Sequence, residues 1–288
     1  MLASGLVRFI LTFMTDKCSP DLLAAQVPDG ALVAIPAEQS FVSMAMVRAL
    51  IRRGVKDLHL LCVPIGGLAD DMLVGSGCVR TVECAAVSLG EFGLAPRFSN
   101  AVEQGIIEIK DSTCPAIHAA LQASEKGVPF MPLTGLIGTD VLAFRNDWKV
   151  VDDPLAAGNG PIVLLPAIRP DFAIFHVPVA DCYGDVWIGR RRELMTMAHA
   201  SSTSLVTTER IIQEKLVADD TMAAGTLPSI YVGDIIEAKW GAKPLGLPGY
   251  YPLDAEVYQA YADMARTEDG FYAFMDSFLN GDVLVAAE

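Results

Sequence analysis

From Ser19 onward, short apolar runs alternate with stretches whose apolar residues recur at helical spacing. Residues 43–53 show the apolar spacing of an amphipathic helix, and Gly54 follows them as a helix stop. Residues 58–63 read LHLLCV, a nearly continuous apolar run that is typical of a strand buried on both faces. Strands that are separated by helices favour right-handed β-α-β units and a mostly parallel sheet.

The same alternation continues to the carboxyl end of the chain. We expect strands at 31–35, 58–63, 81–88, 106–109, 161–165, 171–177, 204–208 and 230–238. We expect helices at 19–25, 43–53, 96–104, 116–126, 193–200 and 209–216, and a C-terminal helical segment from about 254. The predicted fold class is therefore α/β, with an open, mostly parallel sheet and helices on both of its faces.

The domain organisation follows from the same pattern. We expect a single domain over residues 19–288, and the loop at 146–160 is the best candidate for a break. Residues 1–18 are expected to be an N-terminal extension, in which Met14 offers an alternative start. Residues 1–14 lack the charged start and the small-residue cleavage site of a signal peptide.

Charge and cysteine usage exclude several function classes. The chain has 35 acidic and 21 basic residues, a formal net charge of −14, so neither nucleic acid nor an anionic membrane surface is an expected partner. No apolar stretch approaches the ~18–20 residues of a membrane span. The six cysteines form no CxxC pair and have no zinc-ligand spacing with the four histidines, so we expect no metal site. Reduced, buried cysteines are typical of a cytoplasmic protein.

Several loops that follow predicted strands can bring backbone N–H groups close to a ligand. Gly66 and Gly67 come directly after the strand at 58–63, where two glycines allow an anion-binding turn. Further small-residue loops contain Ser76 and Gly77, and Thr134 and Gly135. An ordinary tight turn explains each of these loops equally well.

Glu91 is the candidate catalytic side chain. It follows the predicted strand at 81–88 between Gly90 and Gly93, so its carboxylate can act at a strand end as a base or nucleophile. A solvated loop glutamate or a helix cap is the alternative. The sequence contains no phosphate-binding loop, no dinucleotide fingerprint and no GxSxG elbow.

An ordered set of motifs resembles a known family. The motifs lie at 46–54, 56–58, 73–79, 91–98, 129–135, 165–171 and 180–184. In this order and spacing they resemble the α subunit of family I CoA-transferases, of the glutaconate and 3-oxoacid type. The resemblance implies the CoA-transferase fold and a hetero-oligomer with a β-type subunit. It also implies transfer of CoA from an acyl-CoA donor to a carboxylate acceptor.

The resemblance also implies how the reaction is divided between subunits. In the two-subunit members the attacking glutamate lies in the β chain, in a Glu-Asn-Gly context that this sequence lacks. The expected share of this chain is binding of the CoA thioester, as a substrate and not as a tightly bound cofactor. The implied binding residues are Gly66, Gly67, Ser76, Gly77, Phe92, Gly93, Thr134 and Gly135, with Glu91 as the candidate catalytic residue.

One departure from the family pattern leaves alternatives open. Residues 35–41 read IPAEQSF where many α subunits carry Gly-Gly-Phe, and this loop adds a second carboxylate, Glu38. A CoA-thioester or ring-cleaving acyl-CoA hydrolase on the same scaffold is one alternative, although residues 110–115 lack the glutamate that such relatives use. A non-catalytic stabilising subunit is another. A sugar-phosphate isomerase of similar architecture has no basic phosphate site to support it.

Overall fold

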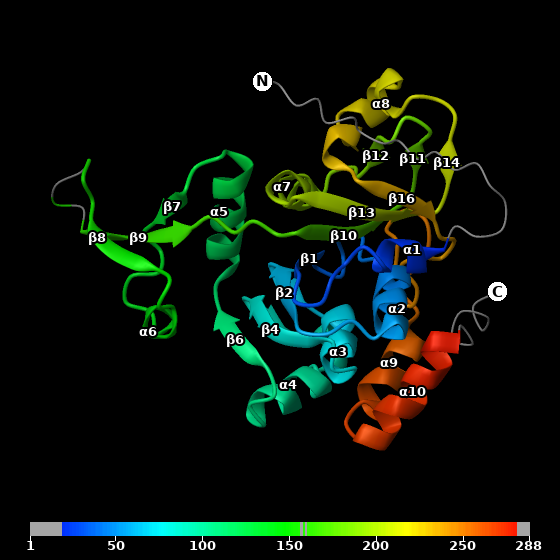
Figure 1. Ribbon diagram of the computed structural model, residues 1–288, viewed down its shortest axis with the longest axis horizontal. Coiled ribbons are helices and arrows are strands. Elements are labelled where there is room, and N and C mark those ends of the chain that lie inside the picture. Colours follow the sequence, from blue (N-terminus) through cyan, green and yellow to red (C-terminus); the bar gives the residue numbers. More distant parts are fainter. Residues whose placement is uncertain (1–18, 156–157, 159, 281–288) are drawn as a thin grey trace.

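The computed structural model describes residues 19–155, 158 and 160–280 (Figure 1), so the expected extension at 1–18 lies outside the described residues. Its centre is a seven-stranded sheet in the order β16-β13-β10-β1-β2-β4-β6, and every neighbouring pair in it is parallel. The strands are β1 (Leu32–Pro36), β2 (Leu58–Val63), β4 (Val79–Cys84), β6 (Glu108–Asp111), β10 (Phe172–Val177), β13 (Thr203–Thr208) and β16 (Asp234–Glu237). The predicted parallel sheet is confirmed.

Helices cover both faces of this sheet, as predicted. One face packs against α1 (Pro20–Ala24), α2 (Met44–Arg53), α3 (Leu68–Gly75), α9 (Ala255–Met264) and α10 (Glu268–Asn280). The other face packs against α5 (Cys114–Glu125) and α7 (Arg192–Ala200). Burial on both faces explains the nearly continuous apolar sequence of β2. Leu60 and Cys62 enter the first core, whereas Leu61 and Val63 enter the second.

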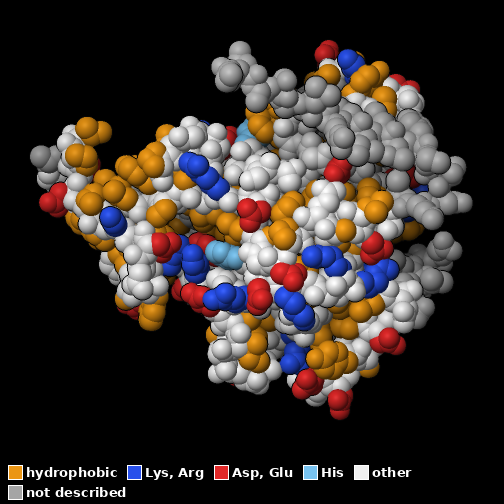
Figure 2. Space-filling model, viewed as in Figure 1, with side chains coloured by type: hydrophobic (Ala, Val, Ile, Leu, Met, Phe, Trp, Pro, Cys, Tyr) orange, Lys and Arg blue, Asp and Glu red, His pale blue; other side chains and the backbone are white. Residues whose placement is uncertain are grey.

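A second, antiparallel sheet projects from the body, and we call residues 130–166 the arm (Figure 1). It contains β7 (Phe130–Leu133), α6 (Val141–Phe144), β8 (Lys149–Asp152) and β9 (Pro161–Pro166), with β9 between the other two strands. The prediction of a plain loop at 146–160 is wrong, because β8 lies within it. All four residues of β8 are exposed, so no buried periodicity marks it. Figure 2 shows hydrophobic side chains gathered on this arm.

The remaining elements are short. They are β3 (Ile65–Gly66), β5 (Ala86–Val87), β11 (Ala180–Asp181), β12 (Val186–Trp187), β14 (Ile211–Ile212), β15 (Thr226–Leu227), α4 (Pro96–Glu103), α8 (Asp220–Ala223) and three 3-10 turns at Gly90–Phe92, Leu216–Ala218 and Ser229–Tyr231. The parallel pair of β3 and β5 holds the loops after β2 and β4 together. The predicted helix at 209–216 is wrong, because this segment starts with β14 and ends in a turn.

Candidate functional site

A cavity of about 410 Å³ opens at the carboxyl edge of the central sheet. This edge is where open α/β sheets usually bind ligands. The cavity is lined by the loops after β1 and β4 and by a segment near the carboxyl end of the chain. Its lining residues are Glu38, Gln39, Leu89, Gly90, Glu91, Phe92, Leu245, Gly246, Pro248, Tyr251, Pro252, Leu253 and Tyr258.

Glu38 is the best-held carboxyl group on the cavity wall. Its Oε1 accepts hydrogen bonds from the backbone N–H of Leu68, the first residue of α3, and from the hydroxyl of Tyr258 at 2.7 Å. Its Oε2 makes no hydrogen bond to any residue in the described ranges, and Glu38 is one of the residues that line the cavity. Burial raises the pKa of Glu38, although the two hydrogen bonds act in the opposite direction.

Gly66 and Gly67 accommodate carboxyl groups of the chain itself. A Cβ at Gly67 would collide with the carboxylate of Glu38, and one at Gly66 would come within 2.9 Å of the carboxylate of Asp70 and 2.7 Å of Cys62 Sγ. The backbone N–H of Gly67 donates to Asp70 Oδ2 at 2.7 Å. Neither glycine is on the cavity lining. Because neither glycine has a Cβ, the carboxyl groups of Glu38 and Asp70 have room to lie against the start of α3.

Two adjacent aspartates are buried behind Glu38. Burial raises the pKa of Asp70 to about 7, and it raises the pKa of Asp71 to about 6. Asp71 accepts hydrogen bonds from the hydroxyl of Tyr261 and from the backbone N–H of Phe98, both at 2.7 Å. These contacts tie α3 to α9 and to α4. The helix that supports Glu38 is therefore held on both sides.

Glu91 and Phe92, two of the predicted site residues, both line this cavity. The Phe92 ring stacks on the Tyr258 ring, with centroids 4.3 Å apart. Glu91 is an exposed carboxylate at the cavity mouth. Gly93 closes this loop, because its carbonyl accepts from the backbone N–H of Leu89 at 2.9 Å.

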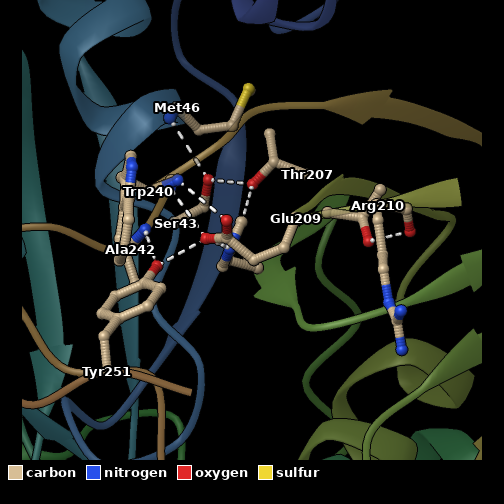
Figure 3. Close-up of polar contacts among 11 residues, drawn as sticks. Ser43, Met46, Thr207, Glu209, Arg210, Trp240, Ala242 and Tyr251 are labelled. Carbon is tan, nitrogen blue, oxygen red and sulfur yellow. Dashed lines mark hydrogen bonds and ion pairs between the residues drawn. The ribbon is translucent and has the colours of Figure 1, made fainter.

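The opposite wall of the cavity depends on a second Tyr–Glu pair (Figure 3). The Tyr251 hydroxyl donates to Glu209 Oε1 at 2.6 Å, and Glu209 also accepts from the backbone N–H groups of Trp240 and Gly241. His176 Nε2 lies 2.8 Å from the same Oε1. Burial alone would raise the pKa of Glu209, but these donors hold it below its usual value. Glu209 therefore acts as an ionised anchor with four donors around it.

A chain of hydroxyl groups continues this network into α2. Burial lowers the pKa of His176, so we treat the ring as neutral, with its Nε2–H donating to Glu209. Its Nδ1 then accepts from Thr207 Oγ1 at 2.8 Å, and Thr207 in turn accepts from Ser43 Oγ at 2.6 Å. Ser43 is the N-cap of α2 and accepts from the backbone N–H of Met46. Both hydroxyl groups of this network, on Thr207 and Ser43, have hydrogen-bond partners within it, which gives the network a structural role.

The structure does not bring the other predicted binding residues to this cavity. Ser76 and Gly77 follow α3 and precede β4, so they lie at the amino edge of the sheet, where Gly77 takes a φ of +66° to end the helix. Thr134 and Gly135 follow β7 on the arm and are exposed. Neither pair lines the cavity.

Glu209, Tyr251 and Tyr258 have no signal in the sequence that predicts a site. Tyr258 packs in the first core, as aromatic residues at helical spacing usually do, but its hydroxyl also holds Glu38. Within the described ranges no group of His, Cys, Asp and Glu side chains is arranged to hold a metal ion. No helix in those ranges has both the length and the apolar character to cross a membrane.

Comparison with known proteins decides the family. A family model described as coenzyme A transferase matches residues 19–238, three quarters of the chain. The chain belongs to the coenzyme A transferase family. The resemblance to CoA-transferase α subunits that the motifs indicated is confirmed.

Three relatives place the chain within this family. An uncharacterised protein of Archaeoglobus fulgidus is 32% identical over 83% of this chain, and the match spans 53% of that relative, about half its length. A 3-oxoadipate CoA-transferase subunit of Pseudomonas knackmussii is 28% identical over 88% of this chain and 90% of its own length. A cholesterol ring-cleaving hydrolase IpdA subunit of Mycobacterium tuberculosis is 29% identical over 83% of this chain and 84% of its own length.

Two solved structures have the same fold. A variant of the decarboxylase AibA/AibB is 28% identical with a TM-score of 0.80, over 91% of this chain and 97% of that one. Glutaconate coenzyme A-transferase of Acidaminococcus fermentans is 24% identical with a TM-score of 0.82, over 93% of each chain. The predicted CoA-transferase fold is therefore confirmed. The names of these family members include a transferase, a hydrolase and a decarboxylase, so the fold alone does not select the reaction.

Proposed function

We propose that this chain is the α subunit of a heteromeric CoA-transferase, which moves CoA from an acyl-CoA donor to a carboxylate acceptor. The observation that carries the proposal is the match to the 3-oxoadipate CoA-transferase subunit, over 88% of this chain and 90% of that relative. CoA thioester is then a substrate, and a β-type subunit is the partner. The exposed carboxyl edge of the sheet, where the cavity opens, is the side on which we expect the partner to complete the site.

The transfer needs one attacking carboxylate, which we assign to the partner. The carboxylate attacks the thioester carbonyl, the C–S bond of the resulting tetrahedral adduct breaks, and CoA leaves as a thiolate, so that a mixed anhydride of the acyl group and the glutamate remains. The thiolate then attacks the glutamyl carbonyl, releases the donor carboxylate and forms an enzyme–CoA thioester. The acceptor carboxylate reverses both steps. The absence of a Glu-Asn-Gly motif from this chain supports the assignment to the partner.

Glu38 gives this chain a role at the reacting group. Burial raises the pKa of Glu38 above that of an exposed glutamate, and its Oε1 already accepts two hydrogen bonds. In its protonated form Glu38 carries the proton on Oε2, the oxygen without a hydrogen-bond donor, and donates a hydrogen bond from it to an oxygen of the acyl group. One such donor typically contributes a factor of about 10² to 10³ in rate. Phe92 and Glu91 form the adjacent wall of the acyl site, and Gly67 keeps Glu38 in place.

Assay of the subunits together and apart tests this proposal. The chain is purified alone and after co-expression with its β-type partner subunit, and exchange of CoA between acyl-CoA and free carboxylates is measured. We expect exchange from the complex and none from the lone chain. Full exchange by the lone chain would overturn the division between subunits, and hydrolysis without exchange by the complex would overturn the transferase assignment.

A hydrolase is the second candidate function, and the geometry of Glu38 favours it. A carboxylate on a cavity wall, with one oxygen held and the other without a hydrogen-bond partner among the described residues, can also act as a base toward water. The relative named as a ring-cleaving hydrolase is as similar to this chain as the transferase relative is. The transferase role needs Glu38 to donate a hydrogen bond, whereas the hydrolase role needs it to take a proton from water. Substitution of Glu38 therefore separates the two functions.

A further inference from the structure

A second cavity, of about 280 Å³, lies between the central sheet and the arm and shares no lining residue with the first. It is bounded by the starts of β1 and β2, by α5 and by residues 145–148 and 166–169. Figure 2 shows basic, acidic and histidine side chains gathered on the visible face beside the arm. The lining residues are Leu32, His59, Glu83, Lys110, Ser112, Ala116, Ala120, Arg145, Asp147, Trp148, Pro166, Ala167, Ile168 and Arg169.

One ion-pair network in this cavity is complete without a ligand. Arg145 Nη2 lies 2.8 Å from both Glu83 Oε1 and Asp147 Oδ2, and Nη1 donates to the carbonyl of Asp111 at 3.1 Å. The side chains of Arg145 and Glu83 are each 3% exposed. The Arg145 guanidinium also stacks on the Trp148 ring, 4.2 Å from its centroid. This network joins the arm to β4 and uses both acidic side chains of the cavity.

Two further cations line this cavity. Among the described residues, the side chains of Lys110 and Arg169 make neither an ion pair nor a hydrogen bond. The buried Nε2 of His59 lies 3.3 Å from Glu83 Oε2, so it faces a carboxylate of the chain itself. The lining holds three cations, Arg145, Lys110 and Arg169, against two acids, Glu83 and Asp147, so its net charge is +1. This is unusual in a chain with a net charge of −14 and points to an anionic ligand.

The rest of the lining is apolar and favours an organic anion. Ala116, Ala120, Ile168 and Leu32 face the same space as the two free cations. An aliphatic chain can pack against these side chains while its carboxylate meets Lys110 and Arg169. An inorganic phosphate would use the charge but leave the apolar surface uncovered.

We propose that this second cavity binds a small aliphatic carboxylate, held by Lys110 and Arg169. This site is separate from the acyl-CoA cavity at the carboxyl edge of the sheet. It stands whether the enzyme is a transferase or a hydrolase, because its evidence involves neither Glu38 nor the partner subunit.

The NMR signal of the Trp148 indole N–H reports binding at this cavity. The signal is assigned with a Trp148→Phe variant, and the folded full chain is titrated with butanoate and, separately, with inorganic phosphate. We expect butanoate to shift the Trp148 signal with millimolar affinity and phosphate to shift it much less. A Trp148 signal that butanoate leaves unmoved, or one that phosphate shifts equally, would overturn the proposal.

Two matched double variants test which cations hold the carboxylate. Lys110→Gln with Arg169→Gln removes both free cations, whereas Arg190→Gln with Arg192→Gln removes two exposed cations at the start of α7. We expect the first pair to weaken butanoate binding by roughly tenfold or more, and the second pair to leave it unchanged. The other indole signals report that each variant remains folded. Equal binding by both pairs would show that Lys110 and Arg169 do not hold the carboxylate.

Discussion

The hydroxyl of Tyr258 donates to Glu38 Oε1 at 2.7 Å and joins the loop after the first strand of the sheet to a helix 220 residues further along the chain. Tyr251 makes the corresponding contact to Glu209 on the opposite side of the same cavity, at 2.6 Å. Two Tyr–Glu pairs therefore hold the C-terminal segment against the carboxyl edge of the sheet. The cavity and the orientation of Glu38 both depend on this segment.

Gly67→Ala is expected to disrupt the site. The new Cβ would occupy the position of the Glu38 carboxylate, so Glu38 must leave its donors or α3 must shift. We expect a loss of about 1–3 kcal/mol in the free energy of unfolding, together with lower CoA exchange by the complex. Gly135→Ala is the matched control, because a Cβ there meets nothing within 4 Å. Equal stability of the two variants, measured by denaturant unfolding, would contradict the packing around Glu38.

Glu38→Gln and Glu38→Ala separate the two candidate functions. The Gln amide keeps an oxygen for the N–H of Leu68 and a donor for the acyl oxygen, but it cannot release a proton. If Glu38 donates a hydrogen bond in CoA transfer, the Gln variant retains activity within about tenfold and the Ala variant loses about 10²-fold. If Glu38 is the base of a hydrolase, both variants lose activity to a similar extent. Turnover of the assembled enzyme measures the difference.

Asp70→Asn is expected to flatten the pH dependence of stability. Burial raises the pKa of Asp70 to about 7 in the folded chain, whereas an unfolded aspartate titrates near ~3.9. The folded state therefore binds a proton that the unfolded state has lost, and this stabilisation is present at low pH and disappears as the pH rises through about 7. Unfolding near pH ~5 and ~8 should show a smaller difference for Asp70→Asn than for the original chain. The exposed Asp276→Asn is the control, and an unchanged difference in Asp70→Asn would refute the assignment.

Glu209→Gln tests the anchor of the second Tyr–Glu pair. Four donors surround the Glu209 carboxylate, so one of them must face the new amide NH₂ group. We expect a loss of about 1–3 kcal/mol in stability and a looser segment around Tyr251. Glu237→Gln is the control, because that exposed side chain accepts a single hydrogen bond, from the N–H of Ile211. Thermal unfolding that is the same for both variants would show that the network contributes little.

The central sheet was predictable because strands that are buried on both faces have nearly continuous apolar sequences, as in residues 58–63. The arm was not, because all four residues of Lys149–Asp152 are exposed and their pairing with β9 leaves no periodic pattern. The glycines around Ser76 looked like a ligand loop, yet Gly77 serves to end a helix with positive φ.

The site was predictable only in the residues that directly follow strands. Glu38, Glu91 and Gly67 come just after β1, β5 and β3, so their position at the carboxyl edge follows from topology. Tyr258 could not be assigned, because its contact with Glu38 spans 220 residues and its aromatic neighbours are typical of helix packing. Contacts of this kind depend on how the C-terminal helices dock, which local sequence patterns do not encode.

The position of the covalent intermediate tests the account most directly. The assembled enzyme is incubated with acyl-CoA, the enzyme–CoA thioester is reduced with borohydride, and both subunits are mapped by mass spectrometry. We predict a reduced glutamate on the partner subunit, with Glu38 and Glu91 of this chain unmodified. A reduced Glu38 or Glu91 would show that this chain supplies the attacking carboxylate and would contradict the account.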